Sequence, residues 1–335
     1  MPYFLGVDGG NSKTFALVGD ETGRLLALGK GGPSNHQARF GVDGAMAAIG
    51  EAVEQALTGA GLSITDIAHA AFCLAGADYP SDYDLLSGAI AQRWPGLKQF
   101  SVHNDSFAGL RAGTSRSWGV VSVCGTGTNQ AGIGKDGREL QVGGMGYIYG
   151  DFGGGGDLGR EAVRAAFMGA EQRGPATTLT QVVLEHFGYA STADLSYAIY
   201  TRQWDGVNVH RLAPKVFAEA RKGDQAAQEI LVRMGTLLGQ SVCGVLRELN
   251  LAEEAVDVVM AGSTWKGETP IMVDAFRLAV HRVAPRAKLV RPRYEPVVGS
   301  WLLAVEKAGL TVDQAVYGAL EASMPQDLSI YKEEA

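Results

Sequence analysis

The chain has 335 residues, 46% of them apolar, and a net charge of −7. This length exceeds the usual size of one hydrophobic core and predicts two domains. The negative charge with scattered Lys and Arg argues against nucleic acid, apolar windows shorter than roughly 18 residues argue against a membrane span, and the absence of an export signal predicts a cytoplasmic protein.

The chain opens with a predicted meander of three antiparallel strands. Residues 3–7 form an apolar run that ends in the turn Asp-Gly-Gly-Asn-Ser-Lys-Thr, and further strands follow at 15–18 and 24–29. Residues with a period of two follow the glycines, where a P-loop or Rossmann unit would continue as a helix. The turn therefore excludes those common nucleotide-binding motifs.

Alternating helices and strands are predicted next. A helix at 43–60 precedes a strand at 67–75, and a helix at 81–93 precedes a strand at 100–103. Asp105 follows the last of these strands, at the sheet edge where open α/β sheets bind ligands. Asp105 also stands at a good helix start, so a role as helix N-cap is the alternative to a catalytic role.

The pattern of strands around a glycine turn then begins again. Strands are predicted at 118–124, 129–134 and 139–142, with Gly-Thr-Gly-Thr between the first two. Such small residues leave backbone N–H groups bare, which is how proteins hold phosphate oxygens. The two turns suggest a duplicated domain with a ligand between the copies. Asp151 lies in the following glycine-rich loop, where Gly-Asp-x-Gly is also common turn chemistry.

The remainder is predicted to be mainly helical. The expected strands are 256–261, which ends at Gly262, and 287–290. The expected helices are 158–172, 178–187, 192–200, 209–221, 224–249, 297–307 and 311–322. A phosphate cradle next to a carboxylate is what phosphoryl transfer to a hydroxyl needs. The sequence therefore predicts a kinase that acts on a small polyol.

Four motifs in order carry a family resemblance: residues 8–14, Asn104-Asp105, residues 125–129 and residues 261–266. They resemble the phosphate-1, connecting, phosphate-2 and adenosine motifs of the actin, Hsp70 and sugar-kinase ATPase superfamily. Within it, the chain resembles the N-acetylglucosamine kinases and the BadF/BadG/BcrA/BcrD ATPase group over about residues 3–320.

The resemblance implies an α/β fold of two ribonuclease H-like (actin-like ATPase) domains with a cleft between them, each a mixed five-stranded sheet flanked by helices. The first domain would comprise residues 1–115 and about 310–325. The second would comprise 116–309 with a helical insertion, and 326–335 would be a flexible tail.

The resemblance also assigns roles to individual positions. Asp8 would face Mg²⁺ through water, and Asp105 would be the catalytic base. The ATP-binding residues would be Gly9, Gly10, Asn11, Ser12, Lys13, Thr14, Gly125, Thr126, Gly127, Gly262 and Ser263. The amino sugar would contact Asn35, His36, Asp105, Asn129, Gly144, Met145 and Asp151. Met145 and Phe152 depart from residues that flank the sugar in these kinases, and His36 also fits a hydrogen-bonding loop residue.

The leading hypothesis from this resemblance is phosphorylation of the 6-hydroxyl of N-acetylglucosamine by a homodimer with ATP and Mg²⁺. Glucosamine and an N-acetylmuramate-type sugar are alternatives: an acetamido group needs an apolar wall and an amide partner, whereas a free ammonium needs a carboxylate. A third hypothesis, an actin-like filament or an Hsp70-like peptide binder, lacks support because we expect no appended peptide-binding domain after residue 335.

A hypothesis of another class is a BadF-type ATPase that activates a partner enzyme through an iron–sulfur cluster. Such a cluster needs Cys thiolates at an interface. Cys73, Cys124 and Cys243 lack CxxC spacing and lie in apolar stretches, so we expect them to be buried and to hold no cluster.

Overall fold

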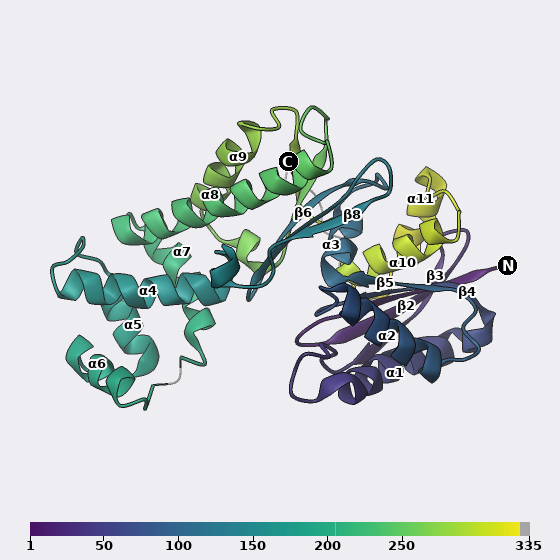
Figure 1. The fold of residues 1–335 in the computed structure, drawn as a ribbon, viewed down its shortest axis with the longest axis horizontal. Helices are drawn as coiled ribbons and strands as arrows, with labels where there is room; N and C mark the ends of the chain where they lie inside the picture. Colours follow the sequence, from purple (N-terminus) through teal and green to yellow (C-terminus); the bar gives the residue numbers. More distant parts are fainter. Residues whose placement is uncertain (205, 329–335) are drawn as a thin grey trace. The chain divides into compact units, whose positions relative to one another are not determined.

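The computed structural model describes residues 1–204 and 206–328, which form two compact units (Figure 1). Unit 1 comprises residues 1–121, 135–137 and the chain from 290 onward, and unit 2 comprises 122–134 and 138–289. Each unit contains one five-stranded sheet flanked by helices, which confirms the predicted fold class. Most of the tail predicted at 326–335 lies outside the described residues.

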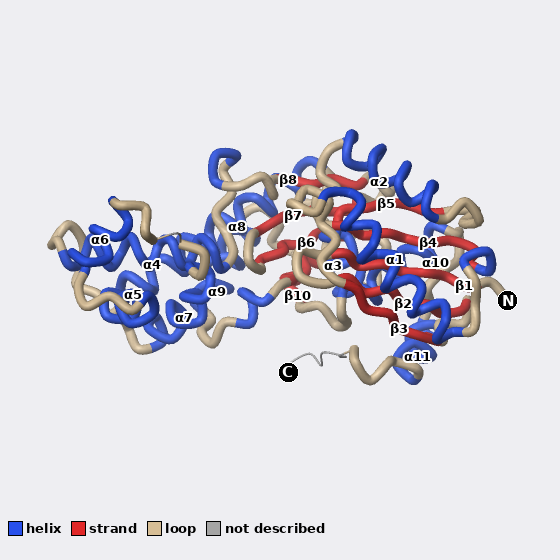
Figure 2. Tube along the Cα trace, turned by 90° about the horizontal axis from the view of Figure 1, so that it is seen from below, coloured by secondary structure: helices blue, strands red, loops and turns tan. Residues whose placement is uncertain are grey.

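Unit 1 is built on a sheet with strand order β3-β2-β1-β4-β5, whose strands lie side by side in Figure 2. The predicted meander is present, since β1 pairs antiparallel with β2 and β2 with β3, while β4 runs parallel to β1 and β5. The elements are β1 Tyr3–Gly9, β2 Thr14–Asp20, β3 Leu25–Gly31, α1 Gly41–Ala60, β4 Ile67–Leu74, α2 Pro80–Arg93, β5 Phe100–Asn104, α3 Asp105–Gly113, α10 Pro296–Lys307 and α11 Gln314–Ala322.

Close helix packing explains why α10 belongs to unit 1. A Cβ on Gly6 of β1 would lie 2.2 Å from the backbone nitrogen of Trp301, and a Cβ on Gly299 would lie 2.0 Å from the carbonyl oxygen of Ala108. The glycines therefore let α10 lie directly on β1 and α3. The sequence placed this helix in the second domain, whereas its packing places it with the first.

Unit 2 has the strand order β10-β9-β6-β7-β8 and an array of helices. Its elements are β6 Gly119–Cys124, β7 Thr128–Ile133, β8 Glu139–Val142, α4 Gly155–Ala170, α5 Leu179–Phe187, α6 Thr192–Tyr200, α7 Ala213–Arg221, α8 Gln225–Glu248, β9 Asp257–Ala261, α9 Ile271–His281 and β10 Lys288–Val290. Helix α7 begins later than predicted, because Pro214, which lacks an N–H, occupies its first turn after the 3₁₀ turn Val209–Leu212.

Helix α9 was not predicted, although it covers α8. Its buried residues Met272, Phe276 and Val280 recur at helical spacing, which is the signal that could have revealed it. A Cβ on Gly235 of α8 would lie 2.1 Å from the carbonyl oxygen of Met272, so the two helices touch along their backbones.

Helix α8 is, among the described residues, the one helix long and apolar enough to cross a membrane, and 56% of its most apolar window is buried. That burial is also typical of a core helix in a soluble protein. The cysteine prediction is confirmed in one respect: Cys73, Cys124 and Cys243 are buried free thiols.

Candidate active site

The β1–β2 turn of unit 1 exposes Asn11, Ser12 and Lys13. The N–H of Gly10 donates to the carbonyl of Lys13 at 3.0 Å, and a Cβ on Gly9 would lie 2.4 Å from Ser34 Oγ. The turn thus presents backbone groups and short polar side chains, as a phosphate site requires.

Thr14 has a different position from the rest of this motif. Its side chain is fully buried, and Oγ1 lies 2.7 Å from the carbonyl oxygen of Gly32 and 2.8 Å from Ser34 Oγ. The hydroxyl therefore braces the loop after β3 behind the turn.

Two half-buried carboxylates lie at this end of the unit 1 sheet, Asp8 in β1 and Asp105 at the start of α3. Burial and then the charge of Asp105 raise the pKa of Asp8 to about 7, with Glu295 adding and Lys13 opposing. Burial and then the charge of Asp78 raise the pKa of Asp105 to about 6, opposed by backbone N–H groups. Crowded carboxylates of this kind favour a cation or a proton donor between them.

Asn104, and not Asp105, caps helix α3. The Oδ1 atom of Asn104 accepts the N–H of Ser106 at 3.0 Å, and Asp105 is the first helical residue. The Asn104 amide also donates to Asp78 Oδ1 at 3.0 Å. Asn104 therefore fills the N-cap position that the sequence analysis offered to Asp105, while backbone N–H groups of the first turn also interact with the Asp105 carboxylate.

Two further carboxylates were not predicted as site residues. Asp78 raises the pKa of Asp105, and Glu295 raises the pKa of Asp8. Asp78 follows β4, at the same sheet edge as Asp105, so the rule that ligands bind beyond the carboxyl ends of strands could have found it. Glu295 precedes α10, and no local sequence pattern connects it to the site.

The loop after β3 places Asn35 beside the β1–β2 turn. The Asn35 amide donates to Asn11 Oδ1 at 2.9 Å, and Asn35 Oδ1 accepts the N–H of Gln37 at 2.9 Å. His36 is buried, with Nε2 3.3 Å from Asp82 Oδ1. His36 thus lies inside the loop that orients Asn35, as a hydrogen-bonding loop residue does.

In unit 2, the turn between β6 and β7 exposes Thr126 and Gly127. The start of α4 braces this turn, because the N–H groups of Gly155 and Gly156 donate to the carbonyls of Gly125 and Thr126 at 2.8 and 3.0 Å. A Cβ on Gly125 or Gly127 would meet nothing within 4 Å. Hydrogen bonds from α4 therefore hold the turn on one side, and the space next to Gly125 and Gly127 is free of other protein atoms.

The end of β9 supports the same turn from another side. Thr264 Oγ1 donates to the carbonyl of Gly125 at 3.0 Å, and the buried Trp265 donates from Nε1 to the carbonyl of Ser122 at 2.9 Å. Gly262, with φ of 103°, lies so close to β6 that its Cβ would be 2.4 Å from the carbonyl oxygen of Cys124. Gly262 and Ser263 are exposed beside the turn.

Asp151 anchors the loop that carries the other predicted sugar residues of unit 2. It is 7% exposed, and its Oδ2 accepts the N–H groups of Met145 and Gly146 at 2.8 and 2.7 Å. A Cβ on Gly144 would lie 3.2 Å from the Asn129 side chain. The structure therefore brings Asn129, Gly144, Met145 and Asp151 together.

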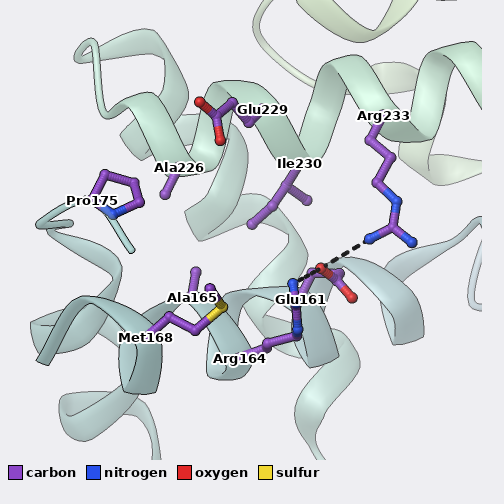
Figure 3. Close-up of a pocket in the computed structure, with 9 residues that line it drawn as sticks. All are labelled: Glu161, Arg164, Ala165, Met168, Pro175, Ala226, Glu229, Ile230 and Arg233. Atoms are coloured by element: carbon purple, nitrogen blue, oxygen red, sulfur yellow. Dashed lines mark hydrogen bonds and ion pairs between the residues drawn. The ribbon is translucent and has the colours of Figure 1, made fainter. Parts of the chain in front are cut away.

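Phe152, which the sequence placed near the sugar, is buried. The Arg233 guanidinium lies over its ring at 4.5 Å from the centroid, and Arg233 Nη1 is 3.3 Å from Glu161 Oε2. Arg233 also borders a cavity of about 170 Å³ between α4 and α8 (Figure 3). Phe152 is thus tied to the helical part of unit 2.

Replacing Asp151 with Ala is expected to raise KM for the acceptor by about tenfold or more and to leave the Kd for ATP unchanged. Two N–H groups would lose a charged acceptor worth about 1.5–3 kcal/mol each, so the 143–146 loop would lose its fixed conformation. Steady-state kinetics and calorimetry measure both constants.

Asp224 provides the matched control for this loop prediction. It also accepts two backbone N–H groups, from Thr178 at 2.7 Å and Ala227 at 2.9 Å, but in the helical array of unit 2. Asp224→Ala should lower stability without changing the acceptor KM. An equal change in KM for both variants would contradict a specific role for Asp151.

Within residues 1–204 and 206–328, no cluster of three or more His, Cys, Asp or Glu side chains could hold a metal ion. Mg²⁺ commonly uses one or two carboxylates together with phosphates and water, and Asp8, whose pKa is raised by burial and then by the charge of Asp105, offers one such carboxylate.

Comparison with known proteins identifies one matching family and several similar sugar kinases. The sequence model of the BadF/BadG/BcrA/BcrD ATPase family matches residues 5–304. An N-acetyl-D-glucosamine kinase of Dictyostelium discoideum is 30% identical over 314 residues, covering 90% of this chain and 97% of the relative. An N-acetylmuramic acid/N-acetylglucosamine kinase of Clostridium acetobutylicum is 27% identical over 304 residues, covering 91% and 98%.

A solved structure shows the same architecture. It is a Chromobacterium violaceum protein with a provisional N-acetylglucosamine kinase assignment, similar with a TM-score of 0.67 and 25% identity over 91% of this chain and 99% of that chain.

Proposed function

Because the chain belongs to the BadF/BadG/BcrA/BcrD ATPase family, we propose that it is an ATP-dependent amino-sugar kinase whose acceptor is the 6-hydroxyl of N-acetylglucosamine. The family match and the curated kinases of similar full length support ATP-dependent sugar phosphorylation. The observation that carries the residue assignment is the position of Asp105, which is half-buried, close enough to Asp8 for its charge to raise the pKa of Asp8, and one residue after the N-cap Asn104.

In this proposal Asp105 accepts the hydrogen bond of the 6-hydroxyl and then its proton, while the hydroxyl oxygen forms a bond to the γ-phosphorus and ADP leaves. Base catalysis of this kind requires an ionised carboxylate within hydrogen-bond reach of the hydroxyl. A pKa of about 6 leaves Asp105 ionised at neutral pH and makes it a stronger base than an ordinary Asp.

The two turns supply the phosphate contacts in the proposal. Asn11 to Lys13, Thr126 and Gly127 are exposed and offer backbone groups, and Gly262 and Ser263 lie beside the second turn, where adenosine would bind. Asp8 would hold Mg²⁺ through water, and this ion would neutralise phosphate charge during transfer. Exclusion of water from the reacting groups would favour transfer over hydrolysis.

A panel of sugars tests the proposal. Glucose, glucosamine, N-acetylglucosamine and N-acetylmuramic acid are each incubated with ATP and Mg²⁺, and ADP formation and the phosphorylated position are measured. Preferred phosphorylation of N-acetylglucosamine at the 6-hydroxyl is the expected result. Preference for glucosamine or N-acetylmuramic acid would show that the proposed acceptor is wrong. ATP turnover that is independent of every sugar would contradict the kinase assignment.

Turnover at saturating Mg²⁺ is expected to fall about tenfold for each pH unit below about 6. The reason is that burial and the charge of Asp78 raise the pKa of Asp105 to about 6, so protonation below this pH removes the base. The pH profile of kcat measures this limb. Constant turnover down to pH 5 would show that Asp105 does not accept the proton in the rate-limiting step.

We also propose a cytoplasmic homodimer, on the basis of the family resemblance and of exposed aromatic residues on α6, where Tyr197 and Tyr200 are 66% and 85% exposed. Light scattering decides the oligomeric state, since a monomer has a mass of 35.3 kDa.

A further inference from the structure

Three consecutive large apolar side chains are exposed in unit 2. Tyr147, Ile148 and Tyr149 are 71%, 95% and 68% exposed. Single exposed apolar residues are ordinary on protein surfaces, but a contiguous group of them is typical of a binding surface. These three residues, which we call the apolar segment, follow directly after Met145 and Gly146 of the proposed acceptor loop.

Backbone hydrogen bonds and two flanking glycines fix the conformation of the apolar segment. It forms one 3₁₀ turn, in which the N–H groups of Tyr149 and Gly150 donate to the carbonyls of Gly146 and Tyr147 at 3.0 Å each. Gly146 and Gly150, with φ of 97° and 94°, provide the left-handed backbone that projects the turn from the loop. Asp151 fixes the base of the loop through the N–H groups of Met145 and Gly146.

The chemistry of the loop distinguishes an acetamido group from a free ammonium. Asp151 is the one carboxylate between residues 143 and 151, and its Oδ2 already accepts two N–H groups while its side chain is buried. The loop therefore has no exposed carboxylate for an ammonium. Its exposed groups are two aromatic rings and an aliphatic side chain, which favour an apolar substituent.

We propose that the apolar segment is a specificity element of the acceptor site, which receives the methyl group of the acetamido substituent and so selects N-acetylated over free amino sugars. This inference rests on the proposed kinase function and adds the residues that discriminate between acceptors. The hydroxyls of Tyr147 and Tyr149 remain able to reach water while their rings contact the sugar.

The test is a double variant, Tyr147→Ser with Tyr149→Ser, assayed with N-acetylglucosamine and with glucosamine. Because one apolar group in a pocket is worth about 10- to 200-fold in discrimination, kcat/KM for N-acetylglucosamine should fall by about 10- to 100-fold, and kcat/KM for glucosamine should change by less than about threefold. Calorimetric binding of N-acetylglucosamine without ATP should weaken in parallel. The Kd for ATP should remain that of the wild type.

Leu278→Ser is the control, since Leu278 is 59% exposed in the same unit but lies in α9, away from both the apolar segment and α6. It should leave both sugars unaffected. Because all the changed side chains are exposed, the variants should fold, which thermal melting verifies.

Each other outcome overturns the inference. An equal loss for both sugars would show that the apolar segment contributes to acceptor binding but does not distinguish the acetamido group from a free amino group. No loss for either sugar would show that the apolar segment does not contact the acceptor. A change only in oligomeric mass would show that the apolar segment contacts a second copy of the chain. Failure of the wild type to phosphorylate any sugar would contradict the kinase proposal itself and is therefore distinguishable.

Discussion

Replacing Asp105 with Asn is expected to lower turnover by about 10²–10⁴-fold, the usual contribution of a general base. The amide is nearly the same size as the carboxylate but cannot accept the proton of the acceptor hydroxyl. Asn104 remains to cap α3, so the helix start should be preserved. The Kd for ATP should change little, since the proposed role of Asp105 is on the sugar side.

The same variant is expected to be more stable than the wild type without ligands at pH 7.5. Burial and the charge of Asp78 raise the pKa of Asp105 to about 6 in the folded state, compared with an ordinary value of 3.8. The folded protein therefore loses stability as pH rises from about 4 through 6, up to about 3 kcal/mol in total. The variant avoids this loss, so its melting temperature should be higher at pH 7.5 and similar below pH 4.

These two readouts separate a catalytic role from a structural one. Asp136→Asn is a suitable control, because Asp136 is an exposed residue of the hairpin between β7 and β8. It should change neither turnover nor stability appreciably. Near wild-type turnover of Asp105→Asn would refute the assignment of the base, and a large loss of stability would show that the charge of Asp105 supports the fold.

Local chemistry explains which parts of the fold could be predicted. The strand, glycine turn and strand around Asp8 and around Gly125 were correct because alternating residues and turn glycines act over a few positions. Likewise, Asp105 could be placed at a sheet edge because it directly follows the strand β5.

Features that depend on tertiary contacts were missed. The packing of α10 on β1 depends on Gly6 and Gly299, which lie far apart in sequence. The burial of Phe152 under Arg233 and the influence of Glu295 on Asp8 also arise from distant segments. The use of the Asp151 carboxylate by backbone N–H groups could be suspected from turn chemistry, but its partners required coordinates.

Gly154→Ala is expected to weaken ATP binding by about 10- to 100-fold, the equivalent of the 1–3 kcal/mol that overpacking typically costs. Gly154 precedes α4 with φ of 87°, and its Cβ would lie 2.5 Å from the carbonyl oxygen of Thr126 and 2.7 Å from Gly127 Cα. These atoms belong to the proposed phosphate-binding turn. They cannot withdraw without breaking the hydrogen bonds that Gly155 and Gly156 donate to the turn.

Two further glycines separate backbone strain from displacement of the turn. Gly188 has φ of 76° and no atom within 4 Å of its Cβ position, so Gly188→Ala should cost about 1 kcal/mol of stability and leave ATP binding intact. Gly127→Ala meets no protein atom within 4 Å either, but its methyl would project from the turn itself. If phosphate oxygens occupy that open space, Gly127→Ala should weaken ATP binding at nearly unchanged stability.

Calorimetric titration with ATP and thermal melting of the three variants give the required comparison. Weak ATP binding by the Gly154 and Gly127 variants with normal binding by the Gly188 variant would support a phosphate site at residues 125–127. Wild-type affinity in the folded Gly154 variant would mean that this turn does not bind the nucleotide. In that case the Gly127 variant, which disturbs no neighbouring atom, should also bind ATP normally, because both variants test the same exposed backbone.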